Sequence, residues 1–426
     1  MDIFKEYDIR GVYPEEIDED KAFKIGRAIG SYLHGEKIFV NHDTRLGSIR
    51  IRNEFVSGLM LSGAAVFELG MNPITVAAFA SFSEKCYGVS ITASHNPPEY
   101  TGILVYHKGI GVSPTQTKKA FLSGGFKEKL GRLIPSNYQQ EYIDYITKDV
   151  GKLDLKVGFD GMGGATTFIF PRMLTDLHSK VFSVHDKVSQ NFFGKTPEPT
   201  KTNSDSLGRL IRKEKLDLGF QLDGDGDRMI VRDERGRFID PMTTAAIFVK
   251  NLKFKKILAT VSCSPMLEKY AKVTYTKVGR PFIEVPLGRK GHDFGVETSS
   301  HFYFGSYYPF SDGLLASLLM LKIVRDSGVK LSELAEEIPK IYYGNYNLKY
   351  GSEKLREASM KRIIKSSSKL GKVNKLDGIR IDTEDGFMLF RKSNTEPIIR
   401  AYYEGNNYKS MARLKKLMNK VLKYGR

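Results

Sequence analysis

The sequence predicts an α/β protein with three α/β units and a smaller C-terminal α+β domain. Its length of 426 residues suggests three or four domains, at roughly 100–200 residues per domain. Strand-like and helix-like segments alternate through the first three quarters of the chain, as in α/β units. The final part differs, because DGIRIDTEDGFMLFRKSNTEPIIRAYYEG indicates adjacent antiparallel strands that a helix follows.

The first predicted domain covers residues 1–150. KIFVNHD (37–43), AAVFELG and YGVSITAS are apolar runs of strand length, and Ile51 to Ser62 has the pattern of an amphipathic helix. The polar, glycine-containing stretch 123–137 interrupts this pattern. QQEYIDYITKDV (139–150) then predicts a helix that connects to the next domain.

The later predicted domains also contain apolar runs of strand length that end in polar or glycine-rich loops. In residues 151–241, LKVGFDGMGGA is a strand entering a glycine-rich turn, and LDLGFQLDGDGDRMIVRDERGRFI indicates two strands around an acidic loop. Residues 242–342 contain KKILATVSCS, KVGRPFIEVPL and FGVETSSHFYF. A linker near 340–350 is expected before the α+β domain of residues 343–426. In each of the first three domains a strand precedes a loop rich in Gly, Ser or Asp, which would fit three related units.

Composition narrows the class and the compartment. Hydrophobic residues make up 41% and charged residues 27%, values ordinary for globular protein. No apolar run approaches the ~18 residues of a membrane span, and the acidic N-terminus lacks the apolar region of a signal peptide. Cys86 and Cys263 lie within or beside apolar runs, which predicts buried thiols rather than a disulfide. We therefore expect a cytoplasmic protein without a membrane partner.

The net charge of +17 admits two interpretations: a nucleic-acid surface, or a positive field that attracts anionic small molecules. Residues 341–426 carry 20 Lys/Arg and 8 Asp/Glu, many in EKLREASMKRIIKSSSK and YKSMARLKKLMNKVLKYGR. Apolar residues recur there at helical spacing, so the lysines are expected on solvated outer helix faces. Zinc-finger spacing and aromatic RNA-binding signatures are missing from the sequence, so no nucleic-acid partner is expected.

The acidic loop LDGDGDR (222–228) predicts a metal site. Asp223, Asp225 and Asp227 alternate with glycines, and such close carboxylates repel each other unless a cation neutralises them. Carboxylate oxygens suit Mg²⁺ or Ca²⁺. Glu234 falls at the twelfth position of an EF-hand-like register, but Arg228 stands where that loop needs glycine, which favours Mg²⁺. The alternative is an acidic turn on the surface.

Two further loops have the composition of a sugar-phosphate site. RKSNTEPIIRAYYEG (391–405) places two arginines and several hydroxyl or amide donors around one turn, which suits a phosphate group. Its alternative is a turn with surface arginines. GVETSSHF (295–302) offers Glu297, Ser299 and His301 at alternating positions, which would share one side of an extended chain and hydrogen-bond a polyol. Taken alone it also fits an ordinary polar loop.

Ser94 lies in SITASHNPPEYTG (90–102), directly after a predicted strand. Pro97 and Pro98 restrict the backbone and remove two NH donors, which favours a stiff, presented loop. A serine there is a turn residue, a nucleophile or a phosphate carrier. The acidic loop and the arginine-rich loop favour the phosphate carrier.

Together these segments resemble the α-D-phosphohexomutase family, in particular its phosphomannomutase/phosphoglucomutase branch. The resemblance runs from end to end through YDIRG (7–11), TASHNPP (92–98), DGDGDR (223–228), TKVG (276–279), ETSSH (297–301), SDG (311–313) and RKSNTEPIIR (391–400). It implies a heart-shaped fold of four domains, three related α/β domains and a smaller C-terminal one. A monomer or a homodimer would be compatible with the sequence.

The resemblance also implies roles for individual residues. Ser94 is the expected carrier of the phosphoryl group, and Mg²⁺ would be held by Asp223, Asp225, Asp227 and an oxygen of the phosphorylated Ser94. Arg228 and Arg10 match residues near the phosphoserine, and His95 is a candidate acid/base. Mannose or glucose phosphate would react through a hexose 1,6-bisphosphate, which is both intermediate and activator. The expected substrate-binding residues are Arg280, Glu297, Ser299, His301, Arg391, Ser393, Asn394, Thr395 and Arg400.

Two segments bear on the choice of sugar. YDIRG resembles the mannose/glucose branch, whereas phosphoglucosamine mutases usually read TDGIRG. ETSSHFYF is also similar to the phosphomannomutase pattern, in which His301 would touch the sugar or its phosphate. We therefore expect phosphomannomutase with phosphoglucomutase activity, and phosphoglucosamine mutase is the alternative.

One position departs from the family pattern. After the serine loop the family usually reads N-G-F-K, but this chain reads Thr101, Gly102, Ile103 and Leu104. The lysine that the family uses in proton transfer and phosphate stabilisation is thus a leucine. Leucine has no titratable group, so the chain is either an active mutase with a rearranged acid/base or a weakly active protein that binds sugar phosphates.

Overall fold

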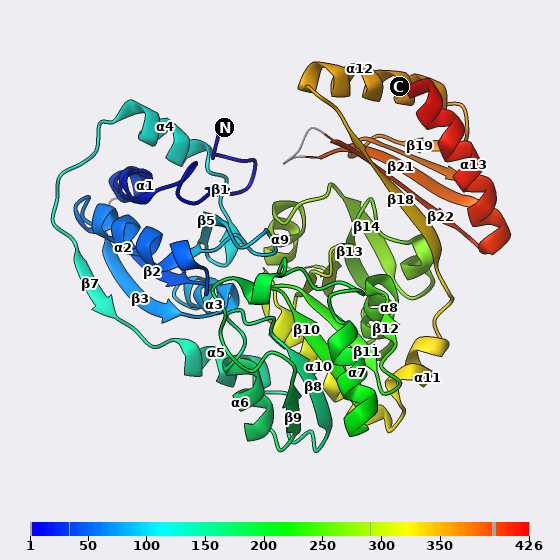
Figure 1. The fold of residues 1–426 in the computed structure, drawn as a ribbon, viewed down its shortest axis with the longest axis horizontal. Helices are drawn as coiled ribbons and strands as arrows, with labels where there is room; N and C mark the ends of the chain where they lie inside the picture. The colour runs from blue at the N-terminus through cyan, green and yellow to red at the C-terminus, as the bar shows by residue number, and fades with distance from the viewer. Residues whose placement is uncertain (1, 34, 290, 394–397, 426) are drawn as a thin grey trace.

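The computed structural model describes residues 2–425 except 34, 290 and 394–397, and in this part of the chain four sheets follow one another. Figure 1 shows the first sheet on the left, the second and third in the middle and the fourth at the upper right. The predicted architecture of three α/β domains and a smaller α+β domain is confirmed. None of the helices in the described residues is long and apolar enough to cross a membrane.

The first sheet has the order β1-β5-β4-β2-β3-β7, with β6 beside β5. Strands β2, β3, β4 and β7 are parallel, while β5 runs antiparallel to both β4 and β1. The strands are β1 Ile9–Val12, β2 Lys37–His42, β3 Ala65–Met71, β4 Tyr87–Ile91, β5 Tyr100–His107, β6 Ile110–Gly111 and β7 Arg132–Pro135. The helices are α1 Glu19–Tyr32, α2 Leu46–Met60, α3 Ile74–Ser83, α4 Thr115–Ser123 and α5 Gln139–Thr147.

The second and third sheets combine parallel and antiparallel pairs. The second has the order β12-β11-β10-β8-β9 and the third β14-β13-β15-β16-β17. The second contains β8 Lys156–Asp160, β9 Lys180–Ser183, β10 Leu218–Leu222, β11 Met229–Asp233 and β12 Phe238–Ile239, with α6 Ile169–Asp176, η1 Phe192–Gly194 and α7 Asp205–Glu214. The third contains β13 Lys256–Thr260, β14 Lys272–Thr276, β15 Phe294–Val296, β16 Phe302–Phe304 and β17 Tyr308–Ser311, with α8 Pro241–Asn251, η2 Pro265–Lys269, α9 Pro281–Gly288, α10 Gly313–Ser327 and α11 Leu331–Glu336.

The fourth sheet, β18-β22-β21-β20-β19, is antiparallel throughout. Its strands are β18 Tyr342–Lys349, β19 Lys372–Asn374, β20 Ile379–Thr383, β21 Gly386–Lys392 and β22 Ile398–Gly405, and its helices are α12 Glu353–Ser367 and α13 Tyr408–Gly425. The expectation of a linker near 340–350 is wrong, because this segment forms the edge strand β18. It pairs with β22 along its whole length, from Tyr342 opposite Gly405 to Lys349 opposite Ile398.

The hydrophobic cores divide the molecule differently from the sheets. One large cluster runs from Phe79 on α3 through Phe220 on β10 to Phe294 on β15, so it joins the first three sheets. The other face of the first sheet packs separately under α1 and α2, and the fourth sheet has its own core beneath α12 and α13. The first three domains therefore share a continuous interior, whereas the fourth has its own core and meets the third through a smaller buried cluster of Val261, Phe387 and Leu389.

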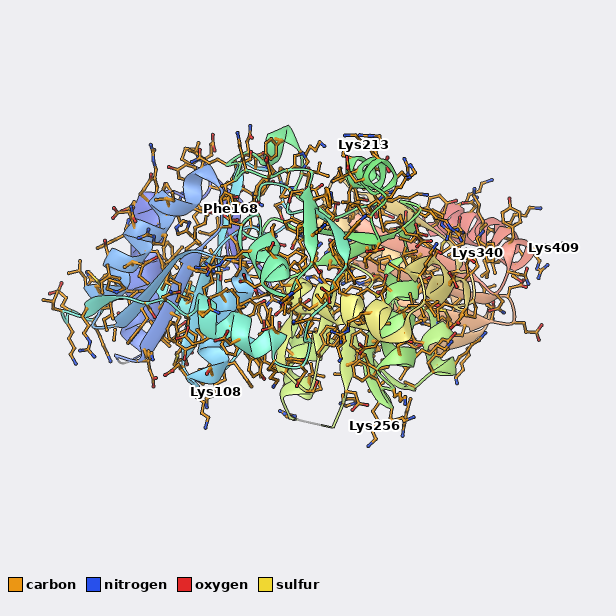
Figure 2. The ribbon with its side chains drawn as sticks, turned by 90° about the horizontal axis from the view of Figure 1, so that it is seen from below. Lys108, Phe168, Lys213, Lys256, Lys340 and Lys409 are labelled. Carbon is orange, nitrogen blue, oxygen red and sulfur yellow. The ribbon has the colours of Figure 1, made fainter. Side chains whose placement is uncertain are left out.

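The basic C-terminal helix is amphipathic, as its apolar spacing predicts. On α13, Leu414 and Met418 are buried against the fourth sheet, while Lys415, Lys416 and Lys420 are exposed. Figure 2 shows the labelled lysines at the outside of the molecule, with Lys409 at the start of α13. Both cysteines are free and buried, as predicted.

Asp312 is a buried junction between the first and third domains. It caps α10 by accepting from Leu315 N, and it also accepts hydrogen bonds from the hydroxyls of Tyr142 on α5 and Tyr308 on β17. We expect Asp312→Ala to lower the free energy of unfolding by about 3–5 kcal/mol, because it removes a cap and leaves two buried hydroxyls unpaired. Thermal and urea unfolding would measure this. The exposed Asp326→Ala near the end of the same helix is the control, and equal stabilities of the two variants would contradict the prediction.

Candidate functional site

The loop that carries Ser94 follows β4 and is held in one conformation. Ser94 is 8% exposed and adopts a left-handed backbone conformation with φ +50°, which is uncommon for a residue other than glycine. Its backbone NH donates to Thr92 Oγ1 at 2.9 Å. The side chain is thus presented at the top of the strand by a constrained turn, as the prolines predict.

Arg45 holds this loop through its backbone. This residue was not predicted from the sequence. Its guanidinium donates to the backbone carbonyls of Ser94, Asn96, Pro97 and Tyr100 at 2.6–3.1 Å. Arg45 is 1% exposed, and its Nε donates to Asp43 Oδ2 at 2.9 Å. The segment HDTRLGS (42–48), at the carboxyl end of β2, could have indicated this residue. The carboxyl ends of parallel strands meet at one edge of a sheet, so Arg45 lies near the loop that follows β4.

We expect Arg45 to be required for the reaction predicted for Ser94, although it contacts only the backbone of the serine loop. We expect Arg45→Lys to lower kcat roughly a hundredfold, because a lysine cannot satisfy the four carbonyls and a small displacement of Ser94 is costly. Steady-state kinetics would measure the loss, and thermal unfolding would show that the variant is folded. Arg50→Lys on the exposed side of α2 is the matched control. A kcat within threefold of the wild type would contradict this role.

The predicted metal loop connects β10 to β11, and its aspartates are buried. The exposures of Asp223, Asp225 and Asp227 are 0%, 1% and 2%, so the alternative of an acidic surface turn is wrong. One carboxylate oxygen from each lies within 4.8 Å of the others. The EF-hand alternative is also wrong, since Glu234 accepts from the backbone NH and hydroxyl of Ser332.

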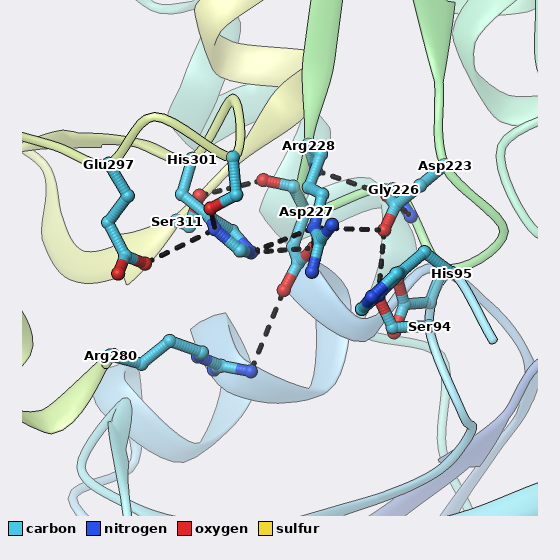
Figure 3. A network of polar contacts seen from close by, with 12 residues as sticks. Ser94, His95, Asp223, Gly226, Asp227, Arg228, Arg280, Glu297, His301 and Ser311 are labelled. Atoms are coloured by element: carbon cyan, nitrogen blue, oxygen red, sulfur yellow. Dashed lines mark hydrogen bonds and ion pairs between the residues drawn. The ribbon is translucent and has the colours of Figure 1, made fainter. Parts of the chain in front are cut away.

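The serine loop and the metal loop meet although 129 positions separate them. Ser94 Oγ donates to Asp223 Oδ2 at 2.9 Å, and Thr92 Oγ1 donates to Asp225 Oδ2 at 3.0 Å. A Cβ on Gly224 would lie 3.0 Å from the carbonyl oxygen of Ser94, so a side chain there would crowd this close approach. Figure 3 shows Ser94 beside Asp223 at the tip of the loop.

The electrostatics of the loop favour a cation. Burial and mutual repulsion raise the pKa of Asp223 well above its usual range and the pKa of Asp225 to about 6. Burial also acts on Asp227, but His301, Arg280 and Arg228 outweigh it and lower its pKa. Among the described residues, Asp225 Oδ1 and Asp227 Oδ1 are buried without a hydrogen-bond partner. These three carboxylates therefore fit a hard divalent cation such as Mg²⁺.

The other predicted catalytic residues surround Ser94. His95 Nδ1 lies 3.3 Å from Ser94 Oγ, and burial, Arg228 and Arg10 hold its pKa well below the usual value. Arg228 Nε lies 3.8 Å from Asp223 Oδ2. Arg10 on β1 donates to Asn96 Oδ1 on the serine loop and to Asp8. The structure thus brings His95 and Arg10 to the serine loop and Arg228 to the metal loop beside it.

The sugar loop between β15 and β16 is a turn, which corrects the extended geometry expected for it. Ser300 has φ +68°, and the turn brings Ser299 Oγ within 2.8 Å and Glu297 Oε2 within 3.2 Å of His301 Nδ1. His301 Nε2 lies 3.4 Å from Asp227 Oδ1, so this histidine connects the sugar loop to the metal loop (Figure 3). Burial opposes protonation of His301, but Asp227 and Glu297 outweigh it and raise its pKa.

Arg391 and Arg400, from the segment 391–405 expected to bind phosphate, line a cavity together with Glu297 and Ser299. Arg391 at the end of β21 is 8% exposed, and its Nε lies 3.2 Å from Asp377 Oδ2. Ser393 is buried, and its carbonyl accepts from Arg356 at 2.8 Å. Asn394 and Thr395 lie outside the described residues. A cavity of about 240 Å³ is lined by Glu297, Thr298, Ser299, Arg391 and Arg400, together with Ser262, Val278, Asn345, Asn347, Leu389, Ala401 and Tyr402.

The site is therefore continuous from Ser94 to the fourth domain. Contacts lead from Ser94 to Asp223, and from Asp227 through His301 to Glu297, which faces the cavity shared with Arg391 and Arg400. Arg280 reaches Asp227 from α9 and is bound to Glu284, a buried acid that sequence reasoning also missed. Leu104 lies on β5 in the large core cluster, and its side chain offers no polar group.

Comparison with known proteins gives matches along the whole chain. The models of phosphoglucomutase/phosphomannomutase alpha/beta/alpha domains I, II and III match residues 1–121, 140–236 and 240–342, and the model of the C-terminal domain matches 352–421. A protein of Thermococcus gammatolerans named probable phosphoglucosamine mutase is 32% identical, covering 97% of both chains. The phosphomannomutase of Methanocaldococcus jannaschii is 33% identical, covering 96% of this chain and 95% of its own.

A solved structure has the same architecture. The crystal structure of a phosphoglucomutase/phosphomannomutase family protein from Burkholderia thailandensis superimposes with a TM-score of 0.91 at 26% identity. The match covers 100% of this chain and 97% of the other. The arrangement of four domains is thus shared with a solved protein over its full length.

Proposed function

The chain belongs to the α-D-phosphohexomutase family of enzymes, and from this premise we propose that it interconverts hexose 1-phosphates and hexose 6-phosphates through a phosphoryl group carried by Ser94. The observation that carries the proposal is the contact of Ser94 Oγ with Asp223, 2.9 Å apart at a buried cluster of three carboxylates. A nucleophilic serine at a metal-binding cluster suits phosphoryl transfer.

In the proposed reaction the phosphoryl group moves twice. The bond between phosphorus and Ser94 Oγ breaks as phosphorus bonds to the free sugar hydroxyl, whose proton ends on Ser94 Oγ. The product of this step is a hexose 1,6-bisphosphate. After it turns around, its other phosphate returns a phosphoryl group to Ser94, and the isomeric monophosphate leaves. Free hexose 1,6-bisphosphate would act as activator by phosphorylating Ser94.

The residues around Ser94 would prepare this transfer. Asp223, Asp225 and Asp227 would hold Mg²⁺ with an oxygen of the phosphoserine, and the bound ion would offset negative charge on the phosphoryl group. Arg228 and Arg10 lie near the serine loop and would orient the phosphoserine. His95 Nδ1, 3.3 Å from Ser94 Oγ, is placed to relay the proton.

The second half of the site would hold the substrate. Arg391, Ser393, Asn394, Thr395 and Arg400 would bind the phosphate that does not react, since guanidinium groups pair bidentately with phosphate. Glu297 and Ser299, which line the same cavity as the two arginines, would hydrogen-bond the sugar hydroxyls in both orientations. His301 and Arg280 would contact the sugar or its phosphates between these groups.

Mannose and glucose phosphates are the proposed substrates, because YDIRG and ETSSHFYF are similar to the mannose/glucose branch. A second candidate is phosphoglucosamine mutase, since a relative with that name is 32% identical over nearly the whole chain. Both candidates use the same carrier and metal loop, so they differ only in contacts to the sugar.

The test is conversion of mannose, glucose and glucosamine 1-phosphates to their 6-phosphates, with Mg²⁺ and a hexose 1,6-bisphosphate present. We expect the highest kcat/KM with the mannose or the glucose substrate. A preference for glucosamine 1-phosphate would support the second candidate. Turnover of all three at the level of Ser94→Ala would contradict mutase activity and leave a weakly active sugar-phosphate-binding protein.

A further inference from the structure

Arg280 is a half-buried cation aimed at the metal loop, with 18% of its side chain exposed. It stands at the start of α9, and its Nη1 lies 3.6 Å from Asp227 Oδ2 (Figure 3). Among the described residues its Nη2 is buried without a hydrogen-bond partner. Since a buried donor without a partner is costly, this terminal nitrogen is available to an anionic oxygen beside Asp227.

The other side of the same guanidinium is fixed. Its Nε donates to Glu284 Oε1 at 2.9 Å, one turn later on α9, and Glu284 is 0% exposed. Glu284 Oε2 accepts from the backbone NH of Gly111 on β6 at 2.7 Å, which ties the pair to the first sheet. The guanidinium carbon also lies 4.2 Å from the centroid of the Phe310 ring. Arg280 is therefore positioned before any substrate arrives.

This cation lies near the face of β5 that carries Leu104. Leu104 and Tyr106 are two residues apart on β5, so their side chains share one face of the sheet. The ring of Tyr106 is 5.7 Å from that of Phe310, which underlies Arg280. The strand that lacks the amine expected at position 104 thus packs beside a different, fixed cation.

We propose that Arg280 is a catalytic residue that donates to the phosphoryl oxygens during transfer between Ser94 and the sugar, in place of the missing amine at position 104. Glu284 is its positioning residue. The inference rests on the proposed function and deepens it, because it assigns Arg280 to the transition state rather than to holding the substrate. Arg280 takes no proton: the sugar hydroxyl proton still ends on Ser94 Oγ as the phosphorus–oxygen bonds exchange.

The first test separates kcat from KM, with the 1-phosphate that the wild type turns over fastest. We expect Arg280→Ala to lower kcat roughly a hundredfold and to change KM less than threefold, as is typical when one transition-state donor is removed. Arg289→Ala removes an exposed charge from the end of the same helix and is the matched control. A kcat within threefold of the wild type would overturn the proposal, whatever happens to KM.

The second test is rescue. Leu104→Lys in the Arg280→Ala background should restore kcat at least tenfold, with thermal unfolding used to show that a lysine at this core position leaves the protein folded. Failure of this rescue would overturn the claim that the two cations share one role. For Glu284, the double variant Glu284→Ala/Arg280→Ala should be no slower than Arg280→Ala alone, because the carboxylate acts through the guanidinium. Additive losses would overturn that assignment.

A single-turnover measurement distinguishes failure of this inference from failure of the proposed function. Hexose 1,6-bisphosphate is mixed with the dephosphorylated protein, and phosphate on Ser94 is followed by intact mass. We expect Ser94 to be phosphorylated more slowly in Arg280→Ala than in the wild type. This measurement does not depend on steady-state isomerisation. Phosphorylation of the wild type without isomerisation would contradict the proposed function alone, and equal rates in the two proteins would overturn the role of Arg280.

Discussion

Ser94→Ala is expected to lower turnover of hexose 1-phosphate at least a hundredfold. The variant lacks the oxygen that would carry the phosphoryl group, and among the described residues Ser94 Oγ is the hydroxyl that donates to Asp223 at the metal loop. Loss of a covalent nucleophile removes the two-step route altogether, so the effect should appear in kcat. The fold should persist, because the substitution deletes one atom from a loop that Arg45 holds through backbone carbonyls.

Ser123→Ala, at the exposed end of α4, is the control for this substitution. After incubation with hexose 1,6-bisphosphate, intact mass should show one added phosphate on the wild type and on Ser123→Ala, and none on Ser94→Ala. Peptide mapping would locate the group. Phosphate on a residue other than Ser94, or full turnover by Ser94→Ala, would contradict the role of Ser94.

Removal of divalent cations is the second change with a large expected effect. EDTA should abolish turnover and Mg²⁺ in excess should restore it, because three buried carboxylates are left to repel each other and the phosphoryl group. Mg²⁺ should also raise the thermal midpoint of the metal-free protein, since a ligand that binds only the folded state stabilises it. Differential scanning calorimetry would measure this shift without reference to activity.

Asp225→Asn should change two measured quantities in opposite directions: the stability of the metal-free protein and its turnover. Without metal the variant should be at least as stable as the wild type, because one of three repelling carboxylates has been neutralised. Its turnover and its stabilisation by Mg²⁺ should both be lost. Asp186→Asn, at an exposed position of the second domain, should leave both unchanged. Activity that survives EDTA, or stabilisation of Asp225→Asn by Mg²⁺ as in the wild type, would contradict a metal site at this loop.

The sequence predicted the fold class because its signals are local. Strand-length apolar runs such as KIFVNHD end in loops rich in Gly, Ser or Asp, and the carboxyl ends of parallel strands gather at one edge of a sheet. The pairing of Ser94 with Asp223 was instead implied by the family resemblance, because their strands β4 and β10 belong to different sheets. The segment near 340–350 was expected to be a linker, although Tyr342, Gly344, Tyr346 and Leu348 alternate with more exposed residues, as on an edge strand.

Other parts of the site depend on contacts that spacing does not reveal. The partners of Arg45 on the serine loop are backbone carbonyls, which every residue has. No pattern of residue types in the sequence could therefore indicate that Arg45 holds the serine loop. The alternation of Glu297, Ser299 and His301 suggested an extended chain, but Ser300 turns left-handed and gathers them around the histidine. The pairing of Arg280 with Glu284 follows helical spacing, yet its direction toward Asp227 depends on how α9 docks.

The separately packed core of the fourth domain has a consequence for how such enzymes diversify. Arg391 and Arg400 belong to this body, while Ser94 and the aspartates belong to the continuous interior of the other three domains. Mutations in the core of the fourth domain can therefore shift Arg391 and Arg400 without disturbing the packing beneath Ser94. Variants of the fourth domain can therefore differ in how they would hold a phosphate, while the proposed sugar contacts Glu297 and Ser299 stay in the same continuous body as Ser94.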